Sequence, residues 1–280
     1  MAKSLLILTQ YFPPEVGAPQ NRLFELAIRL KSAGIRVVVL TAMPNYPKGE
    51  IHPEYVGKSY FYEEMDGLEV HRSSIYVTKS KGIAKRLRNY FSFVRSSKKI
   101  GLSKLDDSFD YLMVESPPLF LAYTAMTLAK KKNAKLIFNV SDLWPESAEK
   151  LGLVTNKFFL KRAQNLEEKA YRNSDLITGQ TQGIVSNIKG RFPNKEVYWL
   201  PNGCDLDYYN PSRWEGATWR SENGFSKEDI IFFYGGIIGH AQGLQLILKG
   251  AKQIANPNVK FVLMGAGPVK PELLQLKKDL

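Results

Sequence analysis

Four polar side chains follow closely on one strongly apolar run of the sequence. They belong to the segment Phe138–Ser147 and are Asn139, Ser141, Asp142 and Glu146. In α/β proteins, loops at the carboxyl ends of buried parallel strands are where binding and catalytic residues collect. We therefore expect Asn139 and Asp142 to be catalytic residues in a loop that contacts substrate. The structural alternative is that Ser141 or Asp142 caps the following turn while Trp144 packs.

Two other predicted strands also end in segments that suit a binding site. Glu115-Ser-Pro-Pro118 fits a site loop and a structural turn equally well. Pro13–Gln20 follows the first strand and precedes a helix, whose unpaired N–H groups attract an anion. Gly17 would let the backbone approach a phosphate or a sugar closely, although a purely structural proline-rich turn is the alternative. No G-x-G-x-x-G occurs there, which argues against an NAD-dependent oxidoreductase.

A second group of glycines lies late in the chain. Gly235–Gly243 contains four glycines in nine residues after a predicted strand, and Gly265-Ala-Gly-Pro268 follows the next strand. Glycine-rich turns that open into helices suit a diphosphate, although each alone also fits a plain tight turn. Together they predict a nucleotide-binding site formed by Gly17, Gly236, Gly239, Gln242, Gly243, Gly265 and Gly267.

Repeated strand–helix–strand units must position these loops. Ser4–Thr9 and Ile35–Thr41 are apolar without alternation, as expected for strands buried on both faces. Between them, Asn21 is the predicted N-cap of a helix, and Gly34 suits the helix C-terminus. This unit predicts a parallel crossover and an α/β fold class. Asp66-Gly67 predicts the turn of a hairpin.

The same pattern divides the chain into domains. We predict a Rossmann-like domain at 1–200, a linker at 201–226, and the start of a second Rossmann-like domain at 227–280. Only two strands are predicted after the linker, whereas a Rossmann-like domain has five or six. The expectation is therefore that the second domain is incomplete in this chain and that the chain alone has little activity.

Composition excludes several classes of protein. Hydrophobic residues make up 44% of the 280 residues, typical of a folded globular chain. Cys204 is the one cysteine, so an intramolecular disulfide is excluded, and the scattered histidines give no zinc spacing. We assign Asp205-Leu-Asp207 to turn formation and propose no metal. No apolar run is long enough to span a membrane, and no signal peptide is apparent, so we predict a cytoplasmic protein.

The positive charge is concentrated in one segment. From Lys79 to Lys104 there are nine Lys or Arg residues and no acid, so this segment accounts for nine units of the formal net charge of +12. Leu87, Tyr90, Phe91 and Val94 recur there at helical spacing. We predict an interfacial helix at 83–100 that docks on an anionic membrane, rather than a nucleic-acid-binding domain. Its predicted membrane-contacting residues are Arg86, Arg88, Arg95, Lys98 and Lys99. The alternative is a basic helix packed on its own domain.

Several motifs together resemble a known family. They are the loop with Gly17, the Asp66-Gly67 hairpin, the strand end Val197–Pro211, and Tyr234–Leu244. They are similar to the GT-B-fold glycosyltransferases of family 4, most of all to bacterial members that build capsule, colanic-acid or O-antigen sugars, including fucosamine-type transferases. The resemblance covers essentially the whole chain, and its most specific part is Pro-Asn-Gly-x-Asp-x-Asp-x-Tyr.

The resemblance implies a retaining, metal-independent transfer of a sugar from a nucleotide-sugar donor, which we expect to be UDP-linked. The expected acceptor is lipid-linked or a glycan, on the inner face of the membrane. Gly239–Gly243 would hold the phosphates and Gly265–Pro268 would lie near the nucleoside. Many relatives have an Arg and a Lys in the first loop of the second domain, and this chain has only His240 and Gln242. His240 would stabilise the leaving diphosphate if protonated. The family's pair of glutamates falls beyond Leu280. A nucleotide-sugar epimerase or a non-catalytic membrane-binding fragment are the alternatives.

Overall fold

The computed structural model describes residues 2–46, 48–78 and 82–280. These residues divide into two compact units, Met1–Cys204 and Asp205–Leu280, which we call unit 1 and unit 2. Each unit is described by itself. Part of the predicted basic segment, residues 79–81, lies outside the described residues.

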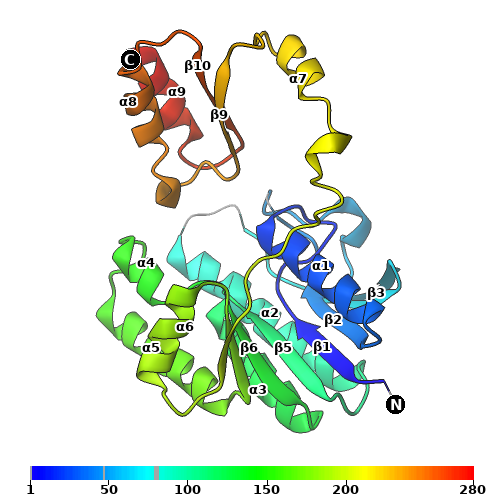
Figure 1. Ribbon diagram of the computed structural model, residues 1–280. Coiled ribbons are helices and arrows are strands. Elements are labelled where there is room, and N and C mark those ends of the chain that lie inside the picture. The colour runs from blue at the N-terminus through cyan, green and yellow to red at the C-terminus, as the bar shows by residue number, and fades with distance from the viewer. Residues whose placement is uncertain (1, 47, 79–81) are drawn as a thin grey trace. The chain divides into compact units, whose positions relative to one another are not determined.

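Unit 1 is built on one twisted sheet (Figure 1). Within the described residues, its strand order is β3-β4-β2-β1-β5-β6-β7-β8, and every neighbouring pair is parallel except β3 with β4. The strands are β1 (Ser4–Leu8), β2 (Arg36–Ala42), β3 (Tyr60–Met65), β4 (Leu68–Ser73), β5 (Tyr111–Ser116), β6 (Lys135–Val140), β7 (Leu176–Gly179) and β8 (Val197–Trp199). The predicted α/β class is confirmed.

Helices cover both faces of this sheet. They are α1 (Ala18–Ser32), α2 (Ile83–Ser103), α3 (Ala122–Lys131), α4 (Glu146–Lys150), α5 (Lys157–Asn173) and α6 (Gln182–Arg191), with short 3-10 turns η1 (Pro53–Tyr55) and η2 (Leu119–Leu121). Leu5 and Ile7 of β1 pack with Leu23 and Ala27 of α1. Leu6 and Leu8 join the larger core that includes α2, α3 and α5. This burial on both faces explains why β1 is apolar without alternation.

Local chemistry sets the turns. The β3–β4 hairpin turns at Asp66 and Gly67, whose φ values of 49° and 72° fit a two-residue type I′ loop, so the predicted hairpin is confirmed. The predicted N-cap Asn21 is wrong, because α1 already begins at Ala18 and Gly17 is its N-cap. Pro19 falls in the first turn, where a helix tolerates proline because that N–H has no intrahelical partner. The prolines of Pro13–Gln20 predict a loop that continues to the end of this segment, and it is shorter in the structure.

Unit 2 contains a two-stranded parallel sheet, β9 (Ile230–Gly235) with β10 (Val259–Met264). It also has η3 (Pro211–Arg213), α7 (Gly216–Glu222), η4 (His240–Gln242), α8 (Gln245–Lys252) and α9 (Lys270–Asp279). The segment predicted as a linker therefore contains a short helix. Its small core consists of Ile238, Leu244, Val269 and Leu273.

One acidic side chain fastens the start of β1 to the start of β5. The Asp110 carboxylate accepts hydrogen bonds from the Ser4 backbone N–H at 2.8 Å, the Ser4 hydroxyl at 2.9 Å and the Lys3 ammonium at 3.1 Å. These donors lower the pKa of Asp110 from 3.8 to about 2, with the Ser4 backbone N–H as the largest cause. Since the charged form is favoured in the fold, Asp110 stabilises unit 1 above its unfolded pKa.

We predict that Asp110→Asn lowers the urea midpoint of unfolding at neutral pH. The deficit relative to wild type should shrink as the pH falls through about 4 towards 2, because the wild-type carboxyl then gains a proton in the fold as well. Urea titrations at several pH values measure this. A deficit that stays constant down to the acid limit would contradict the assignment.

Candidate active site at the carboxyl edge of unit 1

A buried carboxylate connects the carboxyl ends of the central strands. Glu115 of β5 is only 3% exposed. Its oxygens accept hydrogen bonds from the Arg22 guanidinium of α1, the Asn139 amide of β6 and the Ser141 hydroxyl just after β6. A buried carboxylate without such partners would be costly. The three donors therefore explain how an acid can lie inside this edge of the sheet.

The network continues in both directions from Glu115. The amide oxygen of Asn139 accepts a hydrogen bond from the Thr178 hydroxyl of β7 at 2.7 Å. Arg22 Nη1 donates to Asn202 Oδ1, beyond β8, at 3.2 Å. Burial raises the pKa of the Glu115 carboxyl, while the Arg22 charge and the hydroxyl and amide donors act in the opposite direction. Five segments, namely α1, β5, β6, β7 and the chain after β8, thus share one polar cluster.

The loop between β1 and α1 is held by two further buried charges. Glu15 is 2% exposed, and its Oε1 accepts the backbone N–H groups of Asn45 at 2.6 Å and Tyr46 at 2.8 Å. Burial raises the pKa of Glu15, and these N–H groups oppose that shift. Arg72, fully buried, donates to the Pro13 carbonyl and to Glu63. The loop that ends at Gly17 is therefore fixed to the segment after β2 and to β4 itself.

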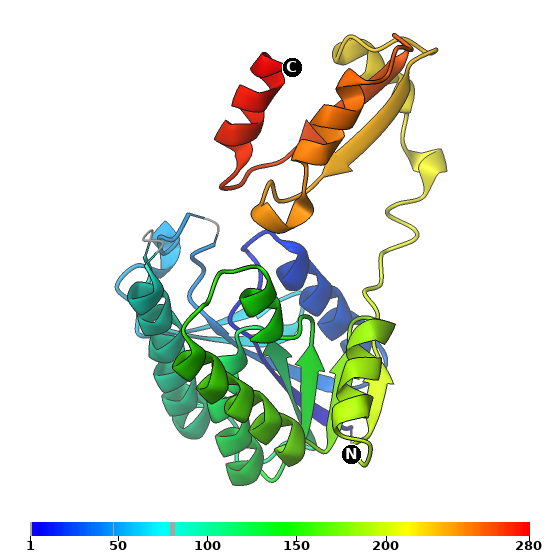
Figure 2. The same ribbon diagram turned by 90° about the vertical axis from the view of Figure 1, so that its left-hand side faces the viewer.

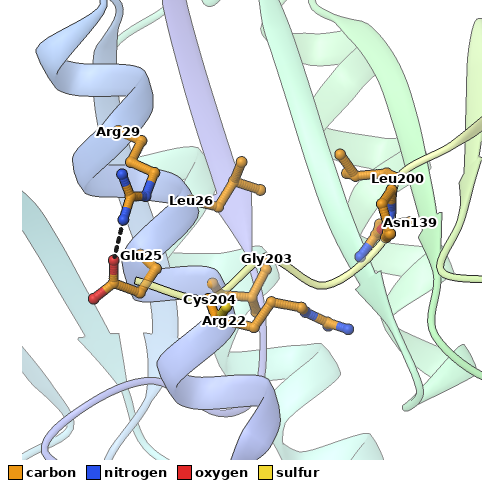
Figure 3. A pocket seen from close by; sticks show the side chains of 10 residues that line it. Arg22, Glu25, Leu26, Arg29, Asn139, Leu200, Gly203 and Cys204 are labelled. Carbon is orange, nitrogen blue, oxygen red and sulfur yellow. Dashed lines mark hydrogen bonds and ion pairs between the residues drawn. The ribbon is translucent and has the colours of Figure 1, made fainter. Parts of the chain in front are cut away.

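Two hollows open beside these polar groups. One, of about 230 Å³, lies between α1 and the segment after β8, and Arg22, Leu26, Asn139 and Cys204 line it (Figure 3). The other, of about 440 Å³, lies where β1 and β2 end, and its lining includes Glu15, Tyr46, Lys48, Glu50 and His52. Carboxylates, an ammonium, an imidazole and an aromatic ring are groups that can bind sugar hydroxyls and a sugar face.

The two predicted catalytic residues of unit 1 do not lie together. Asn139 is 4% exposed and is engaged by Glu115 and Thr178. Asp142 is exposed and accepts a hydrogen bond from the Ser147 hydroxyl at 2.8 Å. Asn139 thus belongs to the buried cluster, whereas Asp142 lies on the surface of the loop and supports its turn.

In unit 2, the glycine loop after β9 presents polar groups to solvent. His240 and Gln242 are exposed on the η4 turn, between Gly239 and Gly243. Gly243 has a left-handed φ of 61°, a conformation that favours glycine. Gly236 is also exposed. These residues lie at the carboxyl end of β9, as the sequence predicts.

Gly265 and Gly267 have a structural reason of their own. A Cβ on Gly265 would lie 1.9 Å from the Gly236 carbonyl oxygen, and one on Gly267 would lie 2.2 Å from the Ile238 carbonyl oxygen. The two loops of unit 2 therefore pack backbone against backbone, and only glycine permits that approach. Their predicted contact with a nucleoside stays a prediction.

The basic helix α2 uses its apolar face inside unit 1. Val94 is buried, and Leu87 and Tyr90 pack against the same core. These three residues of the apolar stripe therefore pack on unit 1, as the alternative had it, while Phe91 is 38% exposed; docking of α2 on a membrane stays a prediction. The predicted membrane-contacting residues are all exposed: Arg86, Arg88, Arg95, Lys98 and Lys99. Any attraction of α2 to lipid would be mainly electrostatic.

The described part of the chain has neither a cluster of metal ligands nor a membrane-spanning helix. There, no three His, Cys, Asp or Glu side chains lie together as a metal site would require. Likewise, none of the described helices is both long and apolar enough to cross a bilayer.

Comparison with protein families identifies the family to which this sheet edge belongs. Residues 17–203 match the Glycosyl transferase 4-like domain, which is more than half of the chain and includes Arg22, Glu115 and Asn139. The chain belongs to the glycosyl transferase 4-like family. It is therefore a glycosyltransferase, as the resemblance in its motifs implied.

Individual relatives agree with this membership. The glycosyltransferase is 24% identical over 98% of its length to WcaI of Escherichia coli K12, a protein provisionally named a colanic acid biosynthesis glycosyl transferase, and it spans 69% of WcaI. Starch Synthase IV of Arabidopsis thaliana, solved with ADP and acarbose, aligns with a TM-score of 0.69 at 15% identity over all of this chain and 72% of its own. Anabaena HepE, solved with UDP and glucose, aligns with a TM-score of 0.62 at 14% identity over 99% of this chain and 65% of its own. The predicted GT-B fold is confirmed.

Sequence reasoning missed three charged residues of this glycosyltransferase. Arg22, Glu15 and Arg72 were not singled out, and Glu115 was left undecided. A lone charge inside an apolar or proline-rich segment has no spacing pattern, so its partner cannot be named before the fold is known. The usable signal was an acid at the end of an otherwise apolar strand, as at Glu115.

We predict that Arg22→Ala lowers the free energy of unfolding by about 3 kcal/mol at neutral pH, because it leaves Glu115 buried without its cation. The loss should be smaller near pH 5, since a neutral carboxyl tolerates burial and gains its proton as the pH falls through its raised pKa. Chemical denaturation at both pH values measures the effect.

Arg29→Ala on the same helix is the matched control. It removes an exposed pair with Glu25 at 3.5 Å and should cost less than about 1 kcal/mol. Equal losses for the two variants would show that Glu115 does not depend on Arg22.

Proposed function

We propose that this glycosyltransferase moves a sugar from a UDP-linked donor to a lipid-linked or glycan acceptor in surface polysaccharide synthesis. The transfer is retaining and needs no metal. Family membership of residues 17–203 carries the proposal, because it assigns the sheet edge with Glu115 and Arg22 to a glycosyltransferase domain. The name of WcaI supports the polysaccharide context, and the HepE complex with UDP-glucose supports the donor class.

The glycine loops of unit 2 are the proposed donor side. Gly236, which is exposed, and Gly243, which is half-buried, leave backbone after β9 open to a diphosphate beside the buried Gly239, and Gln242 adds an exposed amide. During transfer, the bond between the anomeric carbon and the diphosphate oxygen breaks, and a bond to an acceptor hydroxyl forms. The negative charge then develops on the diphosphate, so a positive or hydrogen-bonding group there lowers the barrier. His240 is the proposed group.

The hollow of about 440 Å³ in unit 1 is the proposed acceptor side. Pro14, Glu15 and Val16 form part of its wall, and Tyr46 offers a ring on which a sugar can lie. Asn139 acts by positioning, since its amide is engaged by Glu115 and Thr178. Asp142, exposed on its loop, is the proposed contact to substrate.

We predict that His240→Ala lowers kcat for transfer about 100-fold or more, because removing one group that stabilises transition-state charge costs roughly 10²–10³ in kcat. The stability of unit 2 should not change, because His240 is exposed. The measurement is UDP release together with identification of the glycosylated product, using UDP-sugars and a soluble acceptor.

Lys249→Ala, an exposed cation on α8, is the matched control and should retain full activity. Unchanged kcat in His240→Ala would remove that residue from the mechanism. A product that is an epimerised UDP-sugar, with no glycosylated acceptor, would replace the proposed function by epimerisation.

A second part of the proposal concerns location. The exposed cations of α2 attract the protein to the anionic inner face of the membrane, where a lipid-linked acceptor resides. Arg88, Arg95 and Lys99 lie seven and four residues apart and therefore share one stripe of the helix. Each basic residue near an anionic surface contributes about 1 kcal/mol of attraction.

We predict that the triple change Arg86→Glu, Arg88→Glu and Arg95→Glu strongly reduces cosedimentation with vesicles that contain phosphatidylglycerol. High salt should weaken wild-type binding in the same way, because salt screens surface charge. Reversal of Lys130 and Lys131, exposed at the end of α3, is the control. Equal binding to neutral phosphatidylcholine vesicles would contradict an electrostatic role for α2.

A further inference from the structure

Two large apolar side chains project where α4 ends. Leu151 and Leu153 are 50% and 54% exposed. Between them, Gly152 has a φ of 67°, and the Leu153 N–H donates to the Ala148 carbonyl at 2.9 Å. In helix ends of this kind, the apolar residue after the glycine commonly packs back on the helix. Leu153 remains exposed instead, so the local fold does not use it.

A third apolar side chain projects from the start of α5. Asn156 caps this helix, accepting a hydrogen bond from the Phe159 N–H at 3.0 Å. The helix buries Leu160 and Ala163, and Phe158 lies on the opposite side, 69% exposed. The Arg162 guanidinium, one turn later, lies 4.5 Å from the Phe158 ring centre. Phe158 therefore has a cation beside it and little apolar cover.

The segment that carries these side chains is basic, although Glu149 precedes it and Glu146 of α4 pairs with Lys150 at 2.5 Å. From 150 to 162 the chain has no Asp or Glu, and its charged residues are Lys150, Lys157, Lys161 and Arg162. All four are exposed. Exposed apolar side chains within a cationic segment are the pattern of interfacial membrane binding.

Aromatic contacts connect this turn with α2. Phe159, next to Phe158, lies 6.2 Å from Phe120 between ring centres, and Phe120 lies 4.8 Å from Phe91 of α2. Phe91 is itself 38% exposed. Figure 2 shows α2 (teal) and α5 (green) on the same side of the sheet. The helix α2 and the start of α5 are thus packed together through the buried Phe120 on one side of the sheet.

We propose that Leu151, Leu153 and Phe158 insert into the headgroup region of an anionic phospholipid bilayer; we call these three residues the α4–α5 anchor. The cations at 150–162 and on α2 contact the lipid phosphates. The anchor supplies the apolar contact that α2 mostly lacks, because Leu87, Tyr90 and Val94 of α2 pack on unit 1. The inference rests on the proposed function in one respect, namely that the acceptor is lipid-linked.

The test is cosedimentation of the full 280-residue chain with vesicles of phosphatidylglycerol and phosphatidylcholine, without donor or acceptor. The triple variant Leu151→Ser, Leu153→Ser, Phe158→Ser should bind at least about tenfold more weakly than wild type, since three apolar side chains leave the interface. The matched control changes three exposed apolar residues elsewhere in unit 1, none of them on α2: Val56→Ser, Tyr62→Ser and Tyr198→Ser. It should bind like wild type.

A second variant keeps the anchor and reports its depth. Phe158→Trp should show a blue-shifted emission and added quenching by brominated lipids, relative to the wild-type tryptophans. Wild-type binding by the triple Ser variant, or no added quenching of Phe158→Trp, would overturn the anchor. Loss of self-association or of binding to another protein in the triple variant, with vesicle binding unchanged, would assign these residues to a protein interface instead.

The outcome is separable from the transferase assignment. Transfer to a water-soluble acceptor should be unchanged in the triple Ser variant, because the anchor contacts no proposed substrate group. Vesicle binding that depends on the anchor, in a protein that transfers no sugar, would support the anchor and refute the proposed function. Sugar transfer without any anchor-dependent binding would do the reverse.

Discussion

The buried carboxylate of Glu115 sets the arrangement at the carboxyl edge of unit 1. A charge at this depth requires donors, and they come from three segments: Arg22 from α1, Asn139 from β6 and Ser141 from the loop after it. All three donors share one carboxylate, so each must lie within hydrogen-bond distance of the same two oxygens. The first turns of α1, and with them the loop that ends at Gly17, are therefore positioned by the same interaction that holds β5 and β6 in place.

Charge is distributed differently inside this edge and on the surface around it. Glu115 and Glu15 are buried acids, satisfied by Arg22 and by backbone N–H groups. The basic residues of α2 and of 150–162 are exposed. Fixed polar groups beside a hollow suit a sugar acceptor, whereas exposed cations suit an anionic surface. Under the proposed function, this separation would let unit 1 bind an acceptor and dock on lipid with different groups.

Much of the fold follows from the sequence, and less of the site does. Apolar runs such as Ile35–Thr41 locate strands, and Asp66-Gly67 locates a hairpin, because both signals are local. The prediction that Asn21 caps α1 was wrong, because Pro19 lies in the first turn of the helix and does not precede it. Arg22 and Glu115 are 93 residues apart, so their pairing depends on tertiary structure. Gly265 was predicted to be glycine because a ligand lies close to it, whereas the fold shows that the backbone of another loop does.

Hydrogen–deuterium exchange of the full chain with and without a UDP-sugar shows directly whether the glycine loop of unit 2 binds the donor. Protection of backbone N–H groups by a bound diphosphate depends on where those groups lie, and not on turnover. The account predicts slower exchange at 235–243, centred on Gly239 and Gly243, and no change at the α4–α5 turn. Exchange that is unaffected at 235–243 at saturating UDP-sugar, or protection confined to other segments, would contradict a donor site at the glycine loop of unit 2.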